Sequence, residues 1–571
     1  MGTFFDDASL VMIPSGVKES KLYSIKPSNG DGDFTFSRGT DTATRVNASG
    51  LIEKERSNQL LQSNTFSTTW SNSNSTETSG QSGYDGSSDA WLLTKTDAFG
   101  LLEQSVSGSE VSTFSVYIKA GSLNWAWITL RDSVGSNDSS VYLNLTDGSL
   151  GTSAGGAYIS ATTESVGGGW YRCSVVSSGG YNQVRIAPAD GDGDLTGTSG
   201  NIYIQDAMLN QGLVAQPYIE TTTAAVYEGI TDNLPRLDYS GGASCPSLLL
   251  EPSRTNLIDN TEYLNGWSLQ SGIVVSDNQT TSPEGVQNAG ITTSSFSNSR
   301  IQKNLGTLGS NHIFSAFVKS DGVGTRVQLR SNVTGDNLIL DVAASGEVTH
   351  FSDTAVGNNY GIENYGNGWY RVWFEGTTDG ATSNYYQIYP DVQFGNRSVY
   401  VWGIQMEAGS YPTSYIPTMG TSASRSKDSA GTRSDMQDFL GVDEGTWFTH
   451  LKDMYFDTTG TSVGTFTLRE TSSLQIEIMQ DGNFNYRVDI NNSTAVQDLD
   501  GEDKLAIAWS TSGLVIYVNG SSVYSTTDSQ YASAYSTLYL PDATRAARVY
   551  LKQMLFFPTR LTNAELAALT A

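Results

Sequence analysis

The sequence predicts an all-β protein built from tandem β-sandwich or jelly-roll domains, with one short helix at the C-terminus. Gly occurs 59 times, aromatic residues make up 11% of the chain and charged residues only 16%, a composition that favours short strands joined by turns. Many short segments alternate between apolar and polar side chains, which is the period of a strand. The 571 residues also exceed the roughly 250 to 300 that one core serves, so several domains are expected.

An internal repeat predicts two copies of one domain. The FSVYIK motif at 114–119 recurs as FSAFVK at 314–319, and the GWYR motif at 169–172 recurs at 368–371. The two motifs keep the same order and nearly the same spacing in both places, which is the signature of a duplicated structural unit. Turn residues separate the strands of each copy, and no convincing amphipathic helix intervenes, so each copy is predicted to be a sandwich or jelly roll. Copy 1, a connector and copy 2 are predicted at 53–222, 223–248 and 249–419.

A third sandwich is predicted at 441–571, after a linker at 420–440. Its strands differ from those of the two copies, and Asn519-Gly520 supplies the positive φ angles that a tight hairpin turn requires. Near the end, Thr562 and Glu565 have the spacing of a capping box, which predicts one short helix after them.

Charge and terminal sequence exclude several partners. The chain has 32 Lys and Arg against 59 Asp and Glu, a formal net charge of −27, which repels phosphate backbones and anionic lipid, so no nucleic acid partner is expected. It shows neither a signal peptide pattern nor about 18 consecutive apolar residues, so no membrane insertion is expected. Cys173 and Cys245 form no disulfide framework or zinc spacing, which is typical of folding in a reducing cytoplasm.

Several motifs resemble those of bacteriophage virion proteins. They are FTFSRG at 34–39, RLDY at 236–239 and LLEPSRTNL at 249–257. The C-terminal part, with YVNG at 517–520 and PTRLT at 558–562, resembles the concanavalin A-like (laminin G-like) sandwich that closes many such proteins. The two copies resemble jelly-roll carbohydrate-binding modules.

The resemblance implies a virion surface protein that is made in the host cytoplasm, such as a tail fibre, a spike or a capsid-decorating fibre. It would present its carbohydrate-binding-type domains for adhesion to host-surface glycans. Residues 1–52, which precede the repeats, are the candidate segment for docking to other virion proteins. A homo-oligomer is expected by analogy with fibres and spikes. Two alternatives stay open: a glycan-degrading tailspike and a purely structural virion protein.

Two aromatic clusters are candidate carbohydrate-binding sites. A sugar ring has one apolar face and a rim of hydroxyls, so its site needs an exposed aromatic plane beside polar groups. Trp125 and Trp127 point to the same sheet face in copy 1. Tyr385, Tyr386 and Tyr389 form the corresponding cluster in copy 2. The alternative, that strand alternation places Trp127 and Tyr386 in the core, is weighed beside this one, and Trp170 and Trp369 of the repeated motif are expected to be core or strand-edge residues.

An acidic loop is a candidate calcium site. Asp190, Asp192 and Asp194 alternate with glycines, and such a loop could wrap a hard cation. The loop departs from the EF-hand pattern at Leu195 and Asn201, and a solvated acidic turn is the alternative. No cofactor is required, and the resembled class of sandwich domain implies that a structural calcium ion could be held.

Nothing in the sequence predicts catalysis, so the chain is predicted not to be an enzyme. It has three histidines, and none belongs to a nucleophile or zinc motif. Paired carboxylates for glycoside cleavage depend on their separation in the fold, which the sequence does not reveal. Four glutamates are expected to be solvated in loops or at strand edges: Glu251, Glu262, Glu363 and Glu375.

Overall fold

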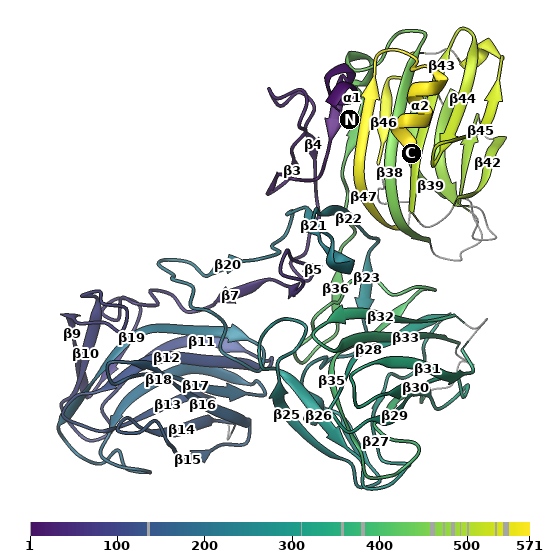
Figure 1. The fold of residues 1–571 in the computed structure, drawn as a ribbon. Helices are drawn as coiled ribbons and strands as arrows, with labels where there is room; N and C mark the ends of the chain where they lie inside the picture. The colour runs from purple at the N-terminus through teal and green to yellow at the C-terminus, as the bar shows by residue number, and fades with distance from the viewer. Residues whose placement is uncertain are drawn as a thin grey trace.

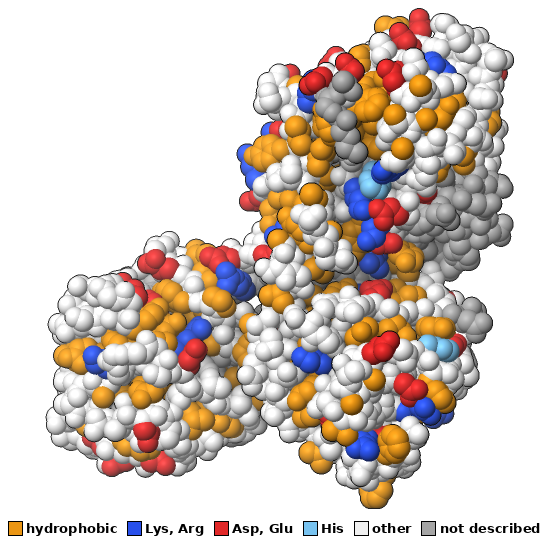
Figure 2. Space-filling view, in the orientation of Figure 1, with side chains coloured by type: hydrophobic (Ala, Val, Ile, Leu, Met, Phe, Trp, Pro, Cys, Tyr) orange, Lys and Arg blue, Asp and Glu red, His pale blue; other side chains and the backbone are white. Residues whose placement is uncertain are grey.

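The computed structural model shows three β-sandwich lobes, coloured purple to blue, teal to green, and green to yellow along the chain (Figure 1). The predicted all-β fold is confirmed, and the described residues contain two short α-helices, α1 (Gly2–Asp7) and α2 (Asn563–Thr570). The structure describes residues 2–133, 137–309, 311–355, 359–377, 383–456, 463–471, 474–480, 486–491, 493–499, 502–531, 534–540 and 547–571. Acidic side chains are scattered over all three lobes (Figure 2).

Copy 1 is a sandwich of two six-stranded antiparallel sheets. Its first sheet runs in the order β16 (Tyr158–Gly167), β17 (Trp170–Ser177), β12 (Ser112–Ala120), β19 (Gly200–Gln211), β10 (Ala90–Lys95) and β9 (Ser75–Gln81). Its second sheet runs in the order β15 (Leu150–Ala154), β14 (Ser139–Asn144), β13 (Trp125–Arg131), β18 (Tyr181–Ala189), β11 (Leu101–Gly108) and β8 (Ser71–Ser73). Alternating residues of β12 and β13 close the core between the sheets, among them Phe114, Val116, Ala126 and Ile128.

Copy 2 has the same strand order in both of its sheets. The first runs in the order β32 (Tyr360–Gly366), β33 (Trp369–Gly376), β28 (His312–Ser320), β35 (Ser398–Ala408), β26 (Ala289–Thr293) and β25 (Val274–Thr280). The second runs in the order β31 (Val348–Asp353), β30 (Asn337–Val342), β29 (Thr325–Ser331), β34 (Tyr385–Tyr389), β27 (Arg300–Asn304) and β24 (Ser268–Gln270). The repeated motifs occupy equivalent strands: FSVYIK lies in β12 and FSAFVK in β28. The pairing of these strands shifts register at the same place, after Ser115 and after Ser315.

The C-terminal sandwich is built from more of the chain than its own segment. Its larger sheet runs in the order β21 (Arg236–Asp238), β22 (Ser247–Leu250), β47 (Ala547–Phe557), β38 (Gly445–Phe456), β43 (Glu502–Ser510), β44 (Gly513–Val518) and β45 (Ser521–Thr526), and β1 (Leu10–Met12) also pairs with β47. Its second sheet runs in the order β37 (Thr432–Arg433), β46 (Thr537–Tyr539), β39 (Val463–Thr471), β40 (Leu474–Gln480), β41 (Tyr486–Ile490) and β42 (Ser493–Leu499).

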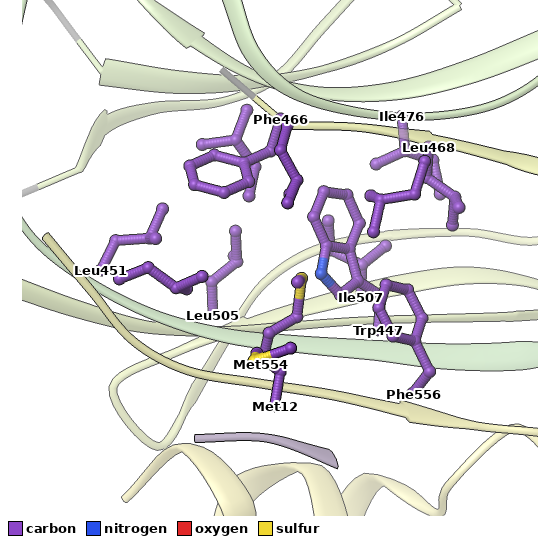
Figure 3. Close-up of a cluster of buried hydrophobic side chains, with 14 of the residues drawn as sticks. Met12, Trp447, Leu451, Phe466, Leu468, Ile476, Leu505, Ile507, Met554 and Phe556 are labelled. Atoms are coloured by element: carbon purple, nitrogen blue, oxygen red, sulfur yellow. The ribbon is translucent and has the colours of Figure 1, made fainter. Parts of the chain in front are cut away.

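The core of this sandwich contains residues from the N-terminal segment and from the connector. Met12 lies beside Met554 and Trp447 (Figure 3), and Leu248 belongs to the same buried cluster. Segments predicted as a separate docking region and a connector therefore contribute strands and core side chains to the last sandwich.

Four small sheets, one of three strands and three of two strands, complete the fold around the three lobes. They are β2 (Val17–Lys18) with β3 (Lys21–Leu22) and β4 (Phe34–Thr35), β5 (Arg45–Val46) with β6 (Ile52–Glu53), β7 (Arg56–Asn58) with β20 (Val226–Glu228), and β23 (Arg254–Asn256) with β36 (Ala423–Arg425). Ile52 of the N-terminal segment packs against Trp369, which is 1% exposed. Trp170 is 2% exposed, so both tryptophans of the repeated motif are buried as predicted.

The C-terminal helix forms as its capping box predicts. The Thr562 side chain accepts from the Glu565 backbone N–H, and the Glu565 side chain accepts from the Thr562 backbone N–H. Leu566 is buried against the outer side of the larger C-terminal sheet. In the described part of the chain, no helix is long and apolar enough to cross a membrane.

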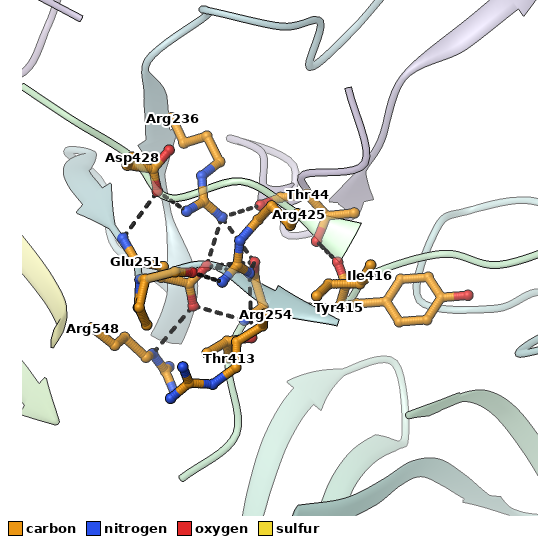
Figure 4. A network of polar contacts seen from close by, with 12 residues as sticks. Thr44, Arg236, Glu251, Arg254, Thr413, Tyr415, Ile416, Arg425, Asp428 and Arg548 are labelled. Carbon is orange, nitrogen blue, oxygen red and sulfur yellow. Dashed lines mark hydrogen bonds and ion pairs between the residues drawn. The ribbon is translucent and has the colours of Figure 1, made fainter. Parts of the chain in front are cut away.

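A buried network of charges joins the lobes (Figure 4). We call it the junction hub, and its members are Arg38, Arg236, Glu251, Arg425, Asp428 and Arg548. Glu251 lies 2.8 Å from guanidinium nitrogens of both Arg236 and Arg425, and Asp428 lies 3.1 Å from Arg38. None of these five side chains is exposed.

The hub gives three of the sequence motifs a structural role. Arg38 comes from FTFSRG, Arg236 from RLDY and Glu251 from LLEPSRTNL. Asp428 pairs with both Arg38 and Arg236, and Arg236 pairs in turn with Glu251. A buried charge needs a partner. The junction therefore depends on motifs that lie far apart in the sequence.

Candidate functional site

The outer face of the second copy 1 sheet carries an aromatic platform. Along β13 the small and aliphatic side chains of Ala126 and Ile128 face the core with no exposed surface, whereas Trp125 and Trp127 point outward and are half-buried. Trp127 pairs across the strands with Tyr142, and the centroids of the two rings lie 6.4 Å apart. The alternative that Trp127 belongs to the core is wrong, because strand alternation buries its neighbours instead.

The neighbouring strand leaves these rings uncovered. On β18, Ala189 lies opposite Trp125 and Ala187 lies opposite Trp127. The alanine side chain is only a methyl group, so it is too short to cover the sides of the indole rings. The platform is thus a shallow surface of ring edges and faces, and not a deep pocket.

Polar side chains continue the same face beyond the rings. Arg185 lies opposite Thr129 on the next outward-facing row, and its Nε is 2.8 Å from a Glu103 carboxylate oxygen. It also donates to the Gln183 side-chain oxygen at 2.8 Å. Guanidinium, carboxylate and amide groups therefore border the aromatic end of the sheet, where they can serve as both donors and acceptors.

The predicted acidic loop lies at the edge of this platform. Asp192 accepts hydrogen bonds from the backbone N–H of Thr152 at 2.6 Å and from its hydroxyl at 3.2 Å. A side chain at Gly151 would collide with both Asp192 and the Trp125 ring, so the carboxylate and the indole are close neighbours. Burial raises the pKa of Tyr142, and the charges of Asp192 and Asp194 add to that rise. Two candidate sites that are separate in sequence belong to one surface.

The structure does not gather the carboxylates of the three aspartates, the predicted calcium ligands, around one point. Asp190 is paired with Lys95 at 2.6 Å and accepts from the Gly197 backbone, while Asp194 accepts from the backbone and hydroxyl of Thr196. The carboxylates therefore serve different local partners. Among the residues that the structure describes, no group of three or more His, Cys, Asp and Glu side chains could hold a metal ion.

The tyrosine cluster of copy 2 is arranged differently from the prediction. Tyr386 is fully buried, and its hydroxyl contacts the His312 ring. Its predicted contact with a sugar is therefore wrong, and the core alternative holds. Tyr389 faces outward but is only 7% exposed, because the Arg300 guanidinium lies 5.6 Å from its ring centroid. Tyr385 is half-buried on the same side.

The equivalent faces of the two copies carry different chemistry. Strand β29 of copy 2 presents Arg326, Gln328 and Arg330 outward, where β13 of copy 1 presents its tryptophans. Arg326 pairs with Asp341 at 2.7 Å and packs against Phe351, which is 48% exposed. Copy 1 thus offers partly exposed rings, while copy 2 offers guanidinium and amide groups. Neither Tyr142 nor Arg326 was singled out from the sequence, although the strand alternation around them was visible.

Three of the four glutamates predicted to be solvated are buried. Glu251, Glu262 and Glu375 are exposed by 2%, 1% and 5%. Glu251 belongs to the junction hub, Glu262 pairs with Lys54 at 3.0 Å, and Glu375 accepts hydrogen bonds from two asparagine side chains, Asn311 and Asn359. Only Glu363 is partly exposed. The prediction failed because the ion and hydrogen-bond partners come from distant parts of the chain.

The comparisons with known proteins assign no family to this chain. No protein-family model matches the chain, and no curated protein matches its sequence. Similar solved structures include the CBM40 module of the Ruminococcus gnavus IT-sialidase bound to α2,3-sialyllactose, at 9% identity and a TM-score of 0.18, over 23% of this chain and 84% of that one. A Trypanosoma rangeli sialidase is 9% identical with a TM-score of 0.21, over 94% and 98% of the two chains. Domains LG4-5 of the mouse laminin α1 chain are 11% identical with a TM-score of 0.16, over 55% and 91%.

The prediction that the chain is not an enzyme is corrected by these comparisons. Sialidases are among the solved structures to which the chain is similar, so an enzyme is not excluded. A likeness at these TM-scores assigns no activity to this chain either. Cleavage of a glycan is therefore a matter for direct measurement.

Proposed function

We propose that the outer face of the second copy 1 sheet binds glycans. The single observation that carries this proposal is the outward row of Trp125, Trp127 and Tyr142, which is half-buried and not packed into the core. Partly exposed tryptophans on a sheet lose their remaining contact with water when a ligand covers them, so they favour an apolar partner surface.

The polar border narrows the class of ligand to a saccharide. One face of a sugar ring carries C–H groups that can lie on an indole, and its hydroxyls both donate and accept hydrogen bonds. Arg185, Glu103 and Gln183 supply both kinds of group next to the rings. A purely apolar ligand would remove water from these groups and offer no hydrogen bond in its place, which is unfavourable.

The place of action proposed here is the surface of a virion, where the chain would adhere to host-surface glycans. This part rests on the resemblance of the FTFSRG, RLDY and LLEPSRTNL motifs to those of bacteriophage virion proteins. Many chains on one particle would raise a weak affinity through multivalency. Peptides of this chain should be found by mass spectrometry in purified particles and should be missing from the soluble fraction after the particles are removed.

The binding proposal is tested with the full chain on a glycan array, followed by titration of the best glycan. The double substitution Trp125→Ala and Trp127→Ala should weaken binding by roughly tenfold or more, because a tenfold change corresponds to about 1.4 kcal/mol and two stacked rings are lost. Tyr227→Ala is the matched control, since Tyr227 is an aromatic residue that is 52% exposed and lies outside this face, on β20. Unchanged affinity in the double variant would refute the assignment.

The glycan-degrading alternative is examined in the same experiment. The full chain is incubated with each glycan that it binds, and the release of reducing ends is recorded over time. Binding without release supports an adhesive role for the face. Release of sugar would show a second, catalytic function and would direct attention to the carboxylates near the bound glycan.

A further inference from the structure

A pocket of about 710 Å³ lies between copy 2 and the C-terminal sandwich. Its walls come from β32, β38 and β47, from the short helical turn at Gly241 and Gly242, and from Val46 and Gly50 of the N-terminal segment. The volume lies within the range of about 300 to 1,000 Å³ that is typical of small-molecule sites, and such sites favour the boundaries between domains. It shares no residue with the aromatic platform of copy 1.

One wall of this pocket is an exposed aromatic ring that its neighbours hold in place. Tyr455 is 39% exposed, and the Tyr411 ring stacks against it at a centroid distance of 5.6 Å. The Arg548 guanidinium lies 5.4 Å from the Tyr455 centroid and 5.4 Å from that of Tyr550. Tyr455 is therefore supported by an aromatic and a cationic neighbour, and part of its surface is left free.

The backbone of β38 is irregular where it supplies this ring. The pairing of β38 with β47 shifts register between Lys452 and Tyr455, and Asp453 has a φ of +48°, which is a left-handed conformation that non-glycine residues rarely adopt. A bulge of this kind redirects the side chains beside it. Lys452, Asp453 and Tyr455 all line the pocket as a result.

The charges around the pocket are balanced. Lys452 and Arg548 are cationic, while Asp453 and Glu363 are anionic, and all four line the space. Lys452 lies 3.5 Å from the Asp453 carboxylate. Figure 2 shows charged side chains of both signs along the C-terminal lobe down to its junction with copy 2.

This balance decides the class of ligand. An anion would meet the two carboxylates, and a cation would meet Lys452 and Arg548. A neutral molecule with many hydroxyls can donate to the carboxylates and accept from the cationic groups at the same time, while its ring lies on Tyr455. We propose that this pocket binds a neutral saccharide unit, as a second site that exists only where copy 2 and the C-terminal sandwich meet.

The experiment starts from the full chain carrying Trp125→Ala and Trp127→Ala, so that the copy 1 platform does not contribute. Saturation-transfer NMR is recorded with glucose, galactose, mannose and N-acetylglucosamine, and with glucuronic acid and glucosamine as charged counterparts. At least one neutral sugar should give a signal, and it should bind more tightly than either charged one. Loss of every neutral signal in this background would overturn the proposal, while the binding proposed for copy 1 would still be judged by its own variants.

A second set of variants assigns the signal to the pocket. Adding Tyr455→Ala should weaken the neutral sugar by roughly tenfold, as expected when one stacked ring is removed, whereas adding Tyr227→Ala should leave it unchanged. Adding Lys452→Gln is an independent test of the same site and should also weaken the neutral sugar. This side chain is 30% exposed, so its replacement does not open the core. A neutral sugar that binds equally well to Tyr455→Ala and Lys452→Gln would overturn the proposal, as would a preference for glucuronic acid or glucosamine.

Discussion

Leu10 lies opposite Phe556 in an antiparallel pairing, so β1 near the start of the chain and β47 near its end are neighbours in one sheet. Leu10 and Met12 have no exposed surface, and Phe4 and Phe5 pack against a cluster that contains Leu555 and Leu566. The first residues are thus part of the C-terminal sandwich and not a free arm. Docking to other virion proteins through residues 1–52 stays a prediction, and any such contact would involve the sandwich to which they belong.

The first prediction concerns this pairing. Leu10→Ala should lower the free energy of unfolding by about 2 to 5 kcal/mol, because it leaves a cavity in a buried cluster. Hydrogen exchange should become faster in the amides of residues 554–556, which lie opposite β1. Ile25→Ala is the control, since Ile25 is 49% exposed. Unaltered protection of β47 in Leu10→Ala would show that β1 contributes little to this sheet.

The second prediction concerns the junction hub. Glu251→Gln should destabilise the protein by about 3 to 5 kcal/mol, because it leaves buried guanidinium groups without their counter-charge. Thermal unfolding followed by calorimetry checks this. Glu53→Gln is the control: Glu53 pairs with Arg45 where both side chains are partly exposed, by 29% and 20%, and such a pair contributes about 0 to 1 kcal/mol. Equal effects of the two substitutions would contradict the central role of Glu251.

The third prediction is the acid sensitivity of the hub. Burial alone would raise the pKa of Glu251, but Arg425, Arg236 and Arg548 hold it below its ordinary value. A carboxyl whose pKa is lower in the folded state stabilises the protein above its unfolded pKa, about 4.3, and this contribution is lost as the pH falls further. The melting temperature should therefore drop below about pH 4, and it should drop less in Glu251→Gln. Parallel pH profiles would argue against this origin.

The fourth prediction concerns Glu55, whose pKa changes in the opposite direction. Burial, followed by the charges of Asp41 and Asp232, raises the pKa of Glu55 to about 8. Its ionisation therefore costs stability, and this cost grows as the pH rises from the unfolded pKa of about 4.3 towards 8. Glu55→Gln should melt at a higher temperature than the native chain at pH 8 and at the same temperature at pH 4. An identical shift at both values of pH would exclude this titration as the cause.

The fifth prediction concerns the two thiols. Cys173 is buried and Cys245 is exposed, and burial raises the pKa of the Cys173 thiol above its ordinary value. Because the thiolate is the reactive form, a disulfide reagent such as DTNB should modify one thiol in the native protein and both in denaturant. Cys245→Ser should abolish the native reaction. A fast reaction of that variant would mean that Cys173 is accessible.

Local patterns were sufficient for the elements that depend on neighbours in sequence. The alternation around Phe114 and Phe314 predicts β12 and β28, and the spacing of Thr562 and Glu565 predicts α2, because each rests on contacts within one strand or one turn. The same local reasoning identified Trp125 and Trp127 as a pair on one face. It did not decide which face is buried, since alternation has the same period on either side of a sheet.

By itself, the sequence determined the all-β class, the duplicated sandwich and the capped C-terminal helix. Strand periodicity, repetition and helix capping can each be recognised from the order of residues along the chain. Only the tertiary structure decided that Glu251 is a buried counter-ion, that Asp192 lies beside Trp125, and that β1 belongs to the last sandwich. Each of these depends on groups that are far apart in the chain, such as Glu251 and Arg425. Their charges and surfaces become partners only after the chain has folded, so no local pattern could reveal them.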